Sequence, residues 1–364
     1  MDVLGQLAPL CAAEPWDPVG LQIGDPSWQV RRALLAIDLT EPVLAEATHK
    51  KVNLIVAYHP LIFDPVKAIT TVDWKQRIIL GAIQRKIAVY SPHTALDAAS
   101  GGLNDWLADG IGPGKILSIR PQVQDANPQY KVVTFVPSDA AVELRRSMAV
   151  AGAGQIGSYS QCSFNVEGHG TFYGKPSSNP KVGARGRLES VKELRIEMVC
   201  GLAKIEAVIN ALRSNHPYEE PVIDLYRLEL PPAIRKGGQG RIVELVRPVS
   251  VRTLCGRIKK RLGLRHLEVA LPDSVKQVRR IGLCAGAGGA LLEECNDIDL
   301  FLTGEMRHHD VLAATARGMA VILAGHVQTE RPYLPVFCAR LANKCGKSVF
   351  WSVSKADYGP SQIV

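Results

Sequence analysis

Short apolar, strand-like runs alternate with helix-like blocks at both ends of the chain, and this alternation restricts the fold more than any other feature. RRALLAIDLT (31–40), NLIVAYH (53–59) and IAVYSPH (87–93) are separated by blocks with helical periodicity. The same rhythm returns between residues 279 and 353. Near-continuous apolar strands joined by helices are typical of a mostly parallel sheet with helices on both faces, so we predict an α/β core.

The middle of the chain has a different composition and pattern of predicted elements. Residues 121–231 are rich in strand-like runs and are interrupted by Gly, Ser, Asn and Pro. Their order is strand, helix, strand, strand, helix, strand, which is the pattern of a ferredoxin-like α+β domain. We therefore predict an inserted domain at 121–231 and a discontinuous core formed by 1–120 and 232–364, because the two ends of a compact unit often lie close together.

Composition excludes several classes of protein. The 364 residues exceed the roughly 150 expected of one domain. No run of 18 apolar residues predicts a membrane span, and no basic segment followed by an apolar run predicts a secretory signal. The eight cysteines form no CxxC pair and lie mostly in apolar runs. This usage is typical of reduced thiols, so we predict a cytoplasmic protein without a disulfide framework.

The formal net charge of +8 raises the question of nucleic acid as a partner. Much of the excess lies in residues 235–265, which contain many Lys and Arg and one acidic residue, Glu244. Aromatic residues are not interleaved there, and we find no nucleic-acid motif. A solvated basic face is the leading interpretation, a surface for an anionic small molecule or partner comes second, and nucleic acid is the least favoured.

Polar residues with useful chemistry follow four of the predicted strands. In open α/β sheets, ligands bind beyond the carboxyl ends of the strands. The candidates at those ends are Tyr58 and His59, His93 and Asp97, Glu305 with His308 and His309, and His326 with Glu330.

Four of these residues suit a metal ion. His59, Asp97, His326 and Glu330 offer two nitrogens and at least two oxygens, which favours Zn, with Mn, Fe or Co as alternatives, over Ca. His326 and Glu330 are four residues apart and can face the same space if a helix begins near Thr329. The competing interpretation is that each histidine only caps or hydrogen-bonds the end of its strand.

The remaining candidates have two interpretations each. His93 can act as a general acid or base, or can simply hydrogen-bond a strand end. Glu305 can orient a substrate or a water, or can cap the helix that begins near Arg307. We assign His93 and Glu305 to catalysis. Tyr58, His308 and His309 are assigned to the substrate pocket.

Three further motifs receive mainly structural interpretations. Gly282, Gly286, Gly288 and Gly289 match neither common nucleotide-loop spacing, so a tight turn is favoured over a phosphate contact. EPWDPVGLQIGD (14–25) is interpreted as a structural or intersubunit loop. HPYEEP (216–221) is interpreted as a structural loop, with metal binding by His216 and Glu219 as the alternative.

The segments that carry these candidates also resemble a known family. EPWDPVGLQIGD, LIVAYHPLIF, PHTALDAASGGLNDWLA, LFLTGEMRHHDVL and GHVQTER are similar, in this order, to the Nif-three-like family, whose members are called GTP cyclohydrolase 1 type 2 homologues. SYSQCSFNVEGHGTFYG and HPYEEP resemble the CutA/PII-like domain inserted in the longer members.

The resemblance implies a dinuclear metal site at His59, Asp97, His326 and Glu330, with the glutamate bridging, in a toroidal homohexamer. One position departs from the family pattern. Bacterial members commonly have two consecutive histidines where this chain has Tyr58-His59. A second ion would lose a nitrogen ligand, so we predict one firm metal site and leave a second open. A packing or hydrogen-bonding Tyr58 is favoured over a phenolate ligand.

These observations lead to two functional hypotheses. The first is a metal-dependent hydrolase, in which the ion lowers the pKa of its water toward ~7 and the hydroxide attacks an electrophilic carbon. The family label implies that this carbon is C8 of a guanine nucleotide. The second is a non-catalytic, metal-binding oligomeric scaffold or regulatory protein, whose inserted domain senses a ligand or docks a partner.

Overall fold

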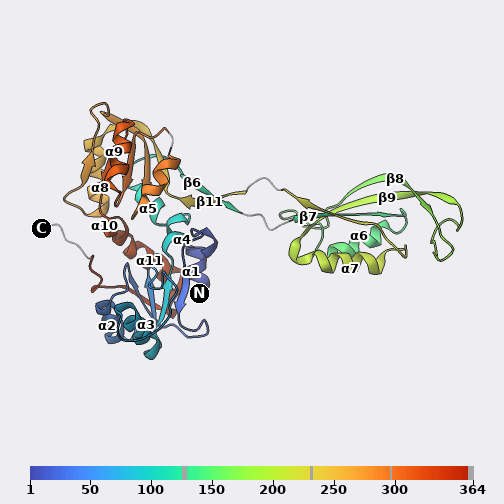
Figure 1. Ribbon diagram of the computed structural model, residues 1–364, viewed down its shortest axis with the longest axis horizontal. Coiled ribbons are helices and arrows are strands. Elements are labelled where there is room, and N and C mark those ends of the chain that lie inside the picture. The colour runs from blue at the N-terminus through green and yellow to red at the C-terminus, as the bar shows by residue number, and fades with distance from the viewer. Residues whose placement is uncertain (125–128, 230–232, 296, 360–364) are drawn as a thin grey trace. The chain divides into compact units, whose positions relative to one another are not determined.

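The computed structural model describes residues 1–124, 129–229, 233–295 and 297–359, and it divides into two compact units (Figure 1). Unit 1 consists of Met1–Gln122 and Arg235–Val364, and unit 2 is Val123–Ile234. A two-stranded ribbon of β6 (Arg120–Gln124) and β11 (Ala233–Gln239) runs across both boundaries between the units. The chain therefore leaves unit 1 and returns to it through adjacent strands.

Unit 1 contains a first sheet of five strands, which combines both ends of the chain. Its spatial order is β1 (Gly20–Ile23), β4 (Ala88–Ser91), β3 (Leu54–Ala57), β2 (Arg32–Ala36) and β17 (Phe350–Val353). Strands β4, β3, β2 and β17 are parallel, and β1 pairs antiparallel with β4. Successive residues of β2 enter different core clusters, as side chains on opposite faces of a strand must.

Helices cover both faces of this sheet. α2 (Glu41–His49) and α3 (Trp74–Gln84) pack against one face, and α1 (Asp2–Leu7) and α11 (Leu334–Cys345) pack against the other. The Asp73 side chain accepts hydrogen bonds from the first backbone amides of α3, and Pro42 occupies the first turn of α2. Both are ordinary helix-start signals.

The second sheet of unit 1 has six strands. Its order is β13 (Glu268–Ala270), β16 (Ala320–Leu323), β15 (Leu300–Thr303), β14 (Gln277–Cys284), β12 (Arg241–Ser250) and β5 (Gly114–Leu117). Only β16, β15 and β14 are mutually parallel. The helices of this half are α8 (Val251–Leu262), α9 (His308–Ala316) and α10 (His326–Glu330).

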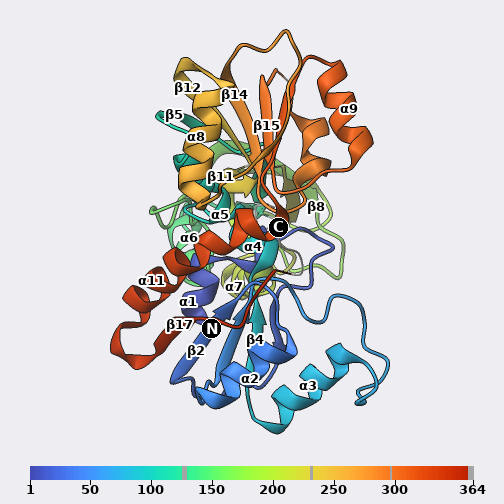
Figure 2. The same cartoon turned by 90° about the vertical axis from the view of Figure 1, so that its left-hand side faces the viewer.

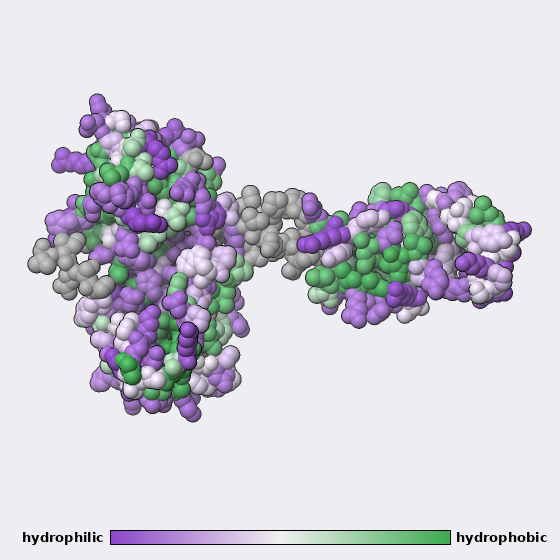
Figure 3. All heavy atoms as spheres, in the orientation of Figure 1, coloured by the Kyte–Doolittle hydropathy of each residue, from purple (hydrophilic) through white to green (hydrophobic). Residues whose placement is uncertain are grey.

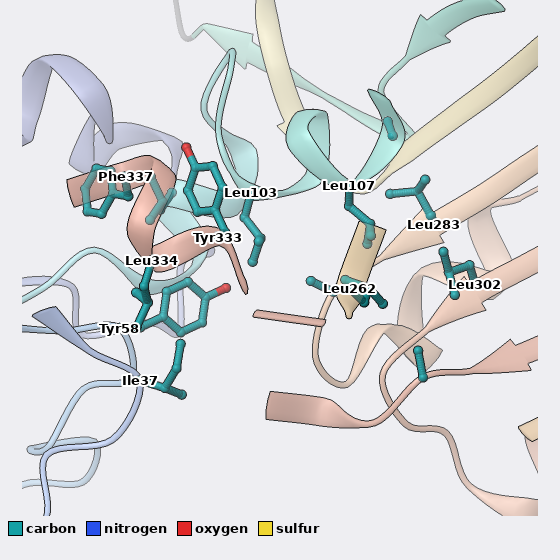
Figure 4. Close-up of a cluster of buried hydrophobic side chains, with 14 of the residues drawn as sticks. Ile37, Tyr58, Leu103, Leu107, Leu262, Leu283, Leu302, Tyr333, Leu334 and Phe337 are labelled. Atoms are coloured by element: carbon teal, nitrogen blue, oxygen red, sulfur yellow. The ribbon is translucent and has the colours of Figure 1, made fainter. Parts of the chain in front are cut away.

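The two sheets share one hydrophobic core. α4 (His93–Ala98), α5 (Leu103–Asp109) and α11 lie between them (Figure 2). Ile37 and Tyr58 from the first sheet, Leu283 and Leu302 from the second, and Leu103 of α5 belong to the same buried cluster (Figure 4). The core therefore fixes the separation of the two sheets.

The mixed α/β class is as predicted, but the core of unit 1 has two large sheets where one was predicted: the first is mostly parallel, and the second mixes parallel and antiparallel pairs. Each antiparallel pair in the two large sheets includes β1, β5, β12 or β13. All four strands lie outside the alternating blocks from which the sheet was predicted. The alternation identifies parallel neighbours, but it does not show where one sheet ends and another begins. Within the second alternating region, Gly288–Glu294 is a 3₁₀ helix.

Unit 2 is one continuous stretch of chain. Its elements are β7 (Gln129–Val136), α6 (Ala141–Val150), β8 (Phe164–Tyr173), β9 (Leu188–Gly201), α7 (Ile205–Asn215) and β10 (Ile223–Leu228). The sheet order is β10-β7-β9-β8, with every pair antiparallel. Both helices pack on one face, where Val132, Leu144 and Leu212 are buried. Apolar side chains also gather on the outer surface over these helices (Figure 3).

Short 3₁₀ helices complete the secondary structure at Leu10–Ala12, Leu202–Lys204, Arg331–Tyr333 and Gly346–Ser348. None of the helices in the described ranges combines the length and hydrophobicity needed to cross a lipid bilayer. Cys162, Cys200, Cys255, Cys284, Cys295, Cys338 and Cys345 are free thiols.

Two carboxylates, buried Asp357 and half-buried Glu46, hold the segment after β17 against β2 and α2. Asp357 accepts hydrogen bonds from the backbone N–H of Ile37 (2.7 Å) and pairs with Arg331 (2.8 Å). Glu46 of α2 accepts hydrogen bonds from Ser354 Oγ (2.6 Å) and from the backbone N–H of Ala356 (3.0 Å). Burial would raise the pKa of Glu46, but Lys50 and these donors lower it to about 2.

Glu46→Gln should destabilise unit 1 at neutral pH by about 1–3 kcal/mol, the range for hydrogen bonds to a charged group. The folded pKa of Glu46 lies below its usual 4.5, so the carboxylate stabilises the fold above pH 4.5. This contribution disappears as pH falls toward about 2. The difference between wild type and variant should therefore shrink over the same range.

Urea denaturation followed by tryptophan fluorescence measures this difference, because all five tryptophans belong to unit 1. Glu41→Gln is the matched control on the same helix, since Glu41 forms an exposed ion pair with Arg77. A Glu46 variant with the same pH dependence as wild type would contradict the assignment.

Candidate metal centre

Three side chains from distant parts of the sequence converge in unit 1. His59 follows β3, and His326 and Glu330 are the first and last residues of α10. One nitrogen or oxygen of each lies within 4.8 Å of those of the other two. Glu330 Oε1 is 3.3 Å from His326 Nε2, and Glu330 Oε2 is 3.4 Å from His59 Nε2. The group could therefore hold a metal ion.

The group forms where the two sheets of unit 1 face each other. β3 belongs to the first sheet, and β16, which leads into α10, belongs to the second. The prediction that these residues meet at the edge of a single sheet was therefore wrong, although the residues do meet. α10 begins at His326 rather than near Thr329, and the i,i+4 spacing places His326 and Glu330 on one face.

A carboxylate holds the outer nitrogen of each imidazole. His59 Nδ1 is 2.9 Å from Asp38 Oδ1, and His326 Nδ1 is 3.0 Å from Glu305 Oε1. When Nδ1 donates its proton to a carboxylate, the Nε2 lone pair is left for a metal, and metal-ligating histidines are commonly held in this way. Both Nε2 atoms face Glu330.

Our sequence reasoning missed Asp38 as a site residue. Asp38 belongs to the strand-like run RRALLAIDLT but was given no role in the site, yet β2 lies beside β3 in the sheet. The signal available in the sequence was a carboxylate that follows one parallel strand and a histidine that follows the neighbouring strand. The pairing of these strands, which places Asp38 at His59, was unknown from the sequence.

The electrostatics of the group favour positive charge. Burial would lower the pKa of His59, but hydrogen bonds with Asp38 and Glu330 raise it to about 10. The hydrogen bond with Glu330 raises the pKa of His326 to about 9, against the opposing effect of burial. Burial would raise the pKa of Glu330, but the two imidazoles hold it below its usual value.

Glu330 also supplies an unsatisfied ligand atom. The residue is 3% exposed, and its buried Oε2 has no hydrogen bond of normal length in the described part of the chain, since His59 Nε2 is 3.4 Å away. A buried carboxylate oxygen without a partner is costly. A cation among these three side chains would satisfy it, so the donor set fits a divalent metal such as zinc.

Gly286 makes room for the Glu330 carboxylate. A Cβ atom at this position would lie 2.5 Å from Glu330 Oε1 and 3.3 Å from His326 Nε2. The backbone has φ +64°, and its N–H donates to Thr329 Oγ1 (2.9 Å). Of the two interpretations of this glycine-rich segment, the structure supports a tight turn, which here packs against the metal-binding group.

Asp97 of α4 lies close by but outside the group of three. Its carboxylate accepts a hydrogen bond from the Tyr58 hydroxyl. Burial raises the pKa of Asp97 to about 7 and that of Tyr58 well above its usual value, so Tyr58 remains a neutral donor. Tyr58 is 3% exposed and is not among the residues that line the described cavities.

His93 also lies beside His59, and their ring centroids are 5.3 Å apart. Its Nδ1 lies 2.9 Å from Oδ1 of buried Asp17, which also accepts a hydrogen bond from the backbone N–H of Thr94 (3.0 Å). His93 has φ +26°, a strained conformation for a non-glycine residue. Asp17 was assigned only to a structural or intersubunit loop, so its contact with His93 was missed.

Glu305 connects the group to a cavity of about 720 Å³. It contacts His326 and lines the cavity together with His308, His266 and Gln328. His309 is exposed and, among the described residues, is not part of the cavity wall. The structure therefore places Glu305 and His308 beside the centre and His309 away from this cavity.

The whole chain is similar to known proteins. A family model described as Duf34/NIF3 (NGG1p interacting factor 3) matches residues 1–358. The GTP cyclohydrolase 1 type 2 homolog of Bacillus subtilis (strain 168) is 32% identical over 362 residues, 98% of this chain and 95% of that protein. NIF3-like protein 1 of Homo sapiens is 34% identical over 368 residues, 99% of this chain and 90% of that protein.

A solved structure agrees with these relatives. It is that of a Bacillus cereus protein related to NIF3, which is 32% identical and matches with a TM-score of 0.74. The match covers 100% of this chain and 97% of that one. The predicted family resemblance is confirmed.

Gly286→Ala should displace the Glu330 carboxylate and lower the divalent metal bound at equilibrium by at least about tenfold, since one ligand is lost or moved. Gly289→Ala is the control in the same segment, because its Cβ would meet only ordinary contacts, the nearest at 3.4 Å. Metal content after dialysis against a defined zinc concentration measures the effect. Equal metal content in the two variants would refute the role of Gly286.

Proposed function

Because the chain belongs to the Duf34/NIF3 family, we propose that it is a divalent-metal-binding protein in which His59, His326 and Glu330 hold one ion. The observation that carries this proposal is the buried Glu330 carboxylate, set between two imidazoles whose outer nitrogens contact carboxylates. Asp97 is the fourth candidate ligand, and its carboxylate also accepts the Tyr58 hydrogen bond through Oδ1. Two nitrogens with carboxylate oxygens favour zinc.

We propose further that the site hydrolyses a small, nucleotide-like ring compound. The ion, when bound, supplies Lewis-acid chemistry by polarising the substrate and lowering the pKa of water. The neighbouring cavity of about 720 Å³ is of the size that small-molecule sites have. The name of the Bacillus subtilis relative, GTP cyclohydrolase 1 type 2 homolog, supports a purine nucleotide as the first compound to test.

The chain's own residues have distinct parts in this proposal. Glu305 orients His326 and presents an exposed carboxylate to the cavity. His308 contributes an imidazole to the same wall, where it can hydrogen-bond the substrate. His93, held by Asp17, is the proton carrier beside His59.

The second candidate function is a non-catalytic metal-binding scaffold. The hydrogen bond from Tyr58 to Asp97 favours it, because it occupies the carboxylate that a second ion would need. A single ion held by two histidines and a glutamate can serve a structural purpose without turnover.

Metal analysis of the purified protein tests the metal site, and nucleotide turnover separates the two functions. Glu330→Gln should reduce bound zinc at least about tenfold, since the neutral amide is a poor ligand for the ion. His309→Ala should leave zinc unchanged, because His309 is exposed and lies outside the group.

Turnover of purine nucleotides that falls with the Glu330 variant supports the enzyme. Zinc bound by wild type without turnover of any compound supports the scaffold. Wild-type protein that binds no zinc, manganese, iron or cobalt would disprove both.

We also propose that the chain self-associates, as the hexamer implied by the family resemblance requires. An exposed apolar segment supports this proposal, because large apolar patches mark interaction surfaces. Val72 is 88% exposed, and Ile69 and Trp74 in the same segment are each more than 40% exposed. Trp16 and Phe63 are also exposed, and their ring centroids are 6.0 Å apart.

Light scattering on a sizing column measures the assembly. Wild type should elute as a hexamer, and Ile69→Asp combined with Val72→Asp should shift the mass to smaller species because it buries charge in the interface. Val246→Asp, at an exposed residue of β12, is the control and should leave the mass unchanged. A monomeric wild type would overturn the proposal.

For unit 2 we propose a ferredoxin-like module of the CutA/PII-like kind. Support comes from its order of elements and from the sheet order β10-β7-β9-β8, with α6 and α7 on one face. Such a module leaves the other face of its sheet available for contacts.

A further inference from the structure

Unit 2 contains a cavity of about 560 Å³ on the face of its sheet opposite α6 and α7. Strands β8 and β9 form its floor, and residues 178–182 and 218–222 form its sides. The metal-binding group and the cavity beside it are in unit 1, so this cavity has no part in the function proposed above.

Two glycines at alternate positions of β8 leave space for this cavity. Gly168 pairs with Glu193 of β9, and Gly170 pairs with Val191. A Cβ atom on Gly170 would lie 2.2 Å from Glu193 Oε2, whereas one on Gly168 would meet nothing within 4 Å. Glycine inside a strand often marks a place where a ligand approaches the backbone closely. Here the Glu193 carboxylate lies over the backbone of Gly170.

Only one of the two carboxylate oxygens of Glu193 accepts a hydrogen bond from the described residues. Tyr218 donates a hydrogen bond to Oε1 (2.7 Å), and both burial and Glu193 raise the pKa of this tyrosine, so the phenol keeps its proton. Oε2 has no hydrogen bond or ion pair with any residue in the described ranges of the chain. One carboxylate oxygen is therefore held in place while the other remains free to accept.

The HPYEEP segment positions Tyr218 for this contact. His216 is buried, its Nε2 is 3.0 Å from the carbonyl oxygen of Phe135, and its Nδ1 accepts from the backbone N–H of Tyr218 (3.1 Å). Burial lowers the pKa of His216, so the ring is neutral. Both ring nitrogens are used, which argues against the alternative of metal binding by His216 and Glu219.

Glu219 joins the two sides of the cavity. Its Oε1 accepts a hydrogen bond from the backbone N–H of Asn179 (2.7 Å), and this bond connects HPYEEP to the segment after β8. The carboxylate of Glu219 is therefore held at the rim. Segments that are far apart in sequence are thus held together around a single opening.

The charges around the cavity are mainly negative, in contrast to the chain's net charge of +8. Glu193, Glu219 and Glu220 line it without an ion pair, while Lys181 is the one lysine in its wall. Arg195 pairs with Glu197 at 2.8 Å, a carboxylate that it shares with Lys131 (2.7 Å), and its guanidinium lies over the Phe135 ring, 5.7 Å from the centroid. Phe172 and Tyr173 add aromatic surface to the wall.

We propose that this cavity binds a small organic cation, an amine carried on an apolar or aromatic body. The ammonium group donates to Glu193 Oε2 at the glycine floor, and the aromatic side chains contact the body of the ligand. Carboxylate and aromatic faces together recognise ammonium groups in many proteins. The site would give the inserted unit a ligand of its own, independent of the metal centre.

Isothermal titration calorimetry of the full chain with three compounds of similar shape tests the proposal. Phenethylamine is cationic, 2-phenylethanol is neutral, and phenylacetate is anionic. Phenethylamine should bind at least about tenfold more tightly than the other two, because a hydrogen bond to a charged partner is worth that factor or more.

Three variants locate the site. Glu193→Gln keeps an oxygen for Tyr218 but removes the charge, and should weaken phenethylamine binding at least about tenfold. Gly168→Leu adds an apolar side chain at a position that lines the cavity, where a Cβ atom meets nothing within 4 Å, and should abolish binding. Glu206→Gln is the matched control, since Glu206 is exposed on α7 at the opposite face of the sheet. Circular dichroism establishes that each variant is folded.

The proposal is overturned if phenylacetate binds as tightly as phenethylamine, or if no compound binds at millimolar concentration. It is also overturned if phenethylamine binds folded Glu193→Gln or Gly168→Leu as tightly as it binds wild type. Loss of binding in both variants, with retention in Glu206→Gln, supports it.

Discussion

The buried carboxylate of Glu330 is the constraint on which unit 1 depends. An uncompensated charge with 3% exposure would cost several kcal/mol, so positive partners must surround it. His59 and His326 supply them from segments separated by most of the chain, and each imidazole is held in turn by Asp38 or Glu305. This chain of contacts fastens the carboxyl end of one sheet to that of the other. The same contacts that stabilise the fold therefore prepare the site for a cation.

The shared hydrophobic core determines how well this arrangement is held. Tyr58 belongs to the core cluster through its ring and to the site through its hydroxyl, which donates to Asp97. Gly286 is held by Thr329 and leaves space for Glu330. The precision of the centre thus comes from packed strands and tight turns rather than from a flexible loop. Unit 2, with its own core, adds a separate surface without disturbing this geometry.

The sequence allowed prediction of those features that have a local pattern. Buried strands and the histidines that follow them could be recognised, so His59, His326 and Glu330 were named as partners. The features that depend on which strands are neighbours could not be predicted from the sequence. Asp38 acquires its role from the pairing of β2 with β3, and Asp17 from its contact with His93. The edge strands β1, β5 and β13, and β12 next to β5, lack the apolar continuity of the parallel strands, which is why two sheets were mistaken for one. Likewise, no spacing rule reveals that Gly168 and Gly170 share a face with Glu193.

The return of β17 to the first sheet has a consequence for synthesis on the ribosome. β2 is made near the beginning of the chain, but its outer neighbour emerges more than 300 residues later. Until then β2 is an unpaired edge, the kind of surface that promotes aggregation of nascent chains. Unit 2 is a continuous segment and can fold during translation, whereas unit 1 must wait. A ribosome that stops before residue 350 therefore releases a chain with a folded insert and an open sheet, a natural substrate for chaperones and proteases.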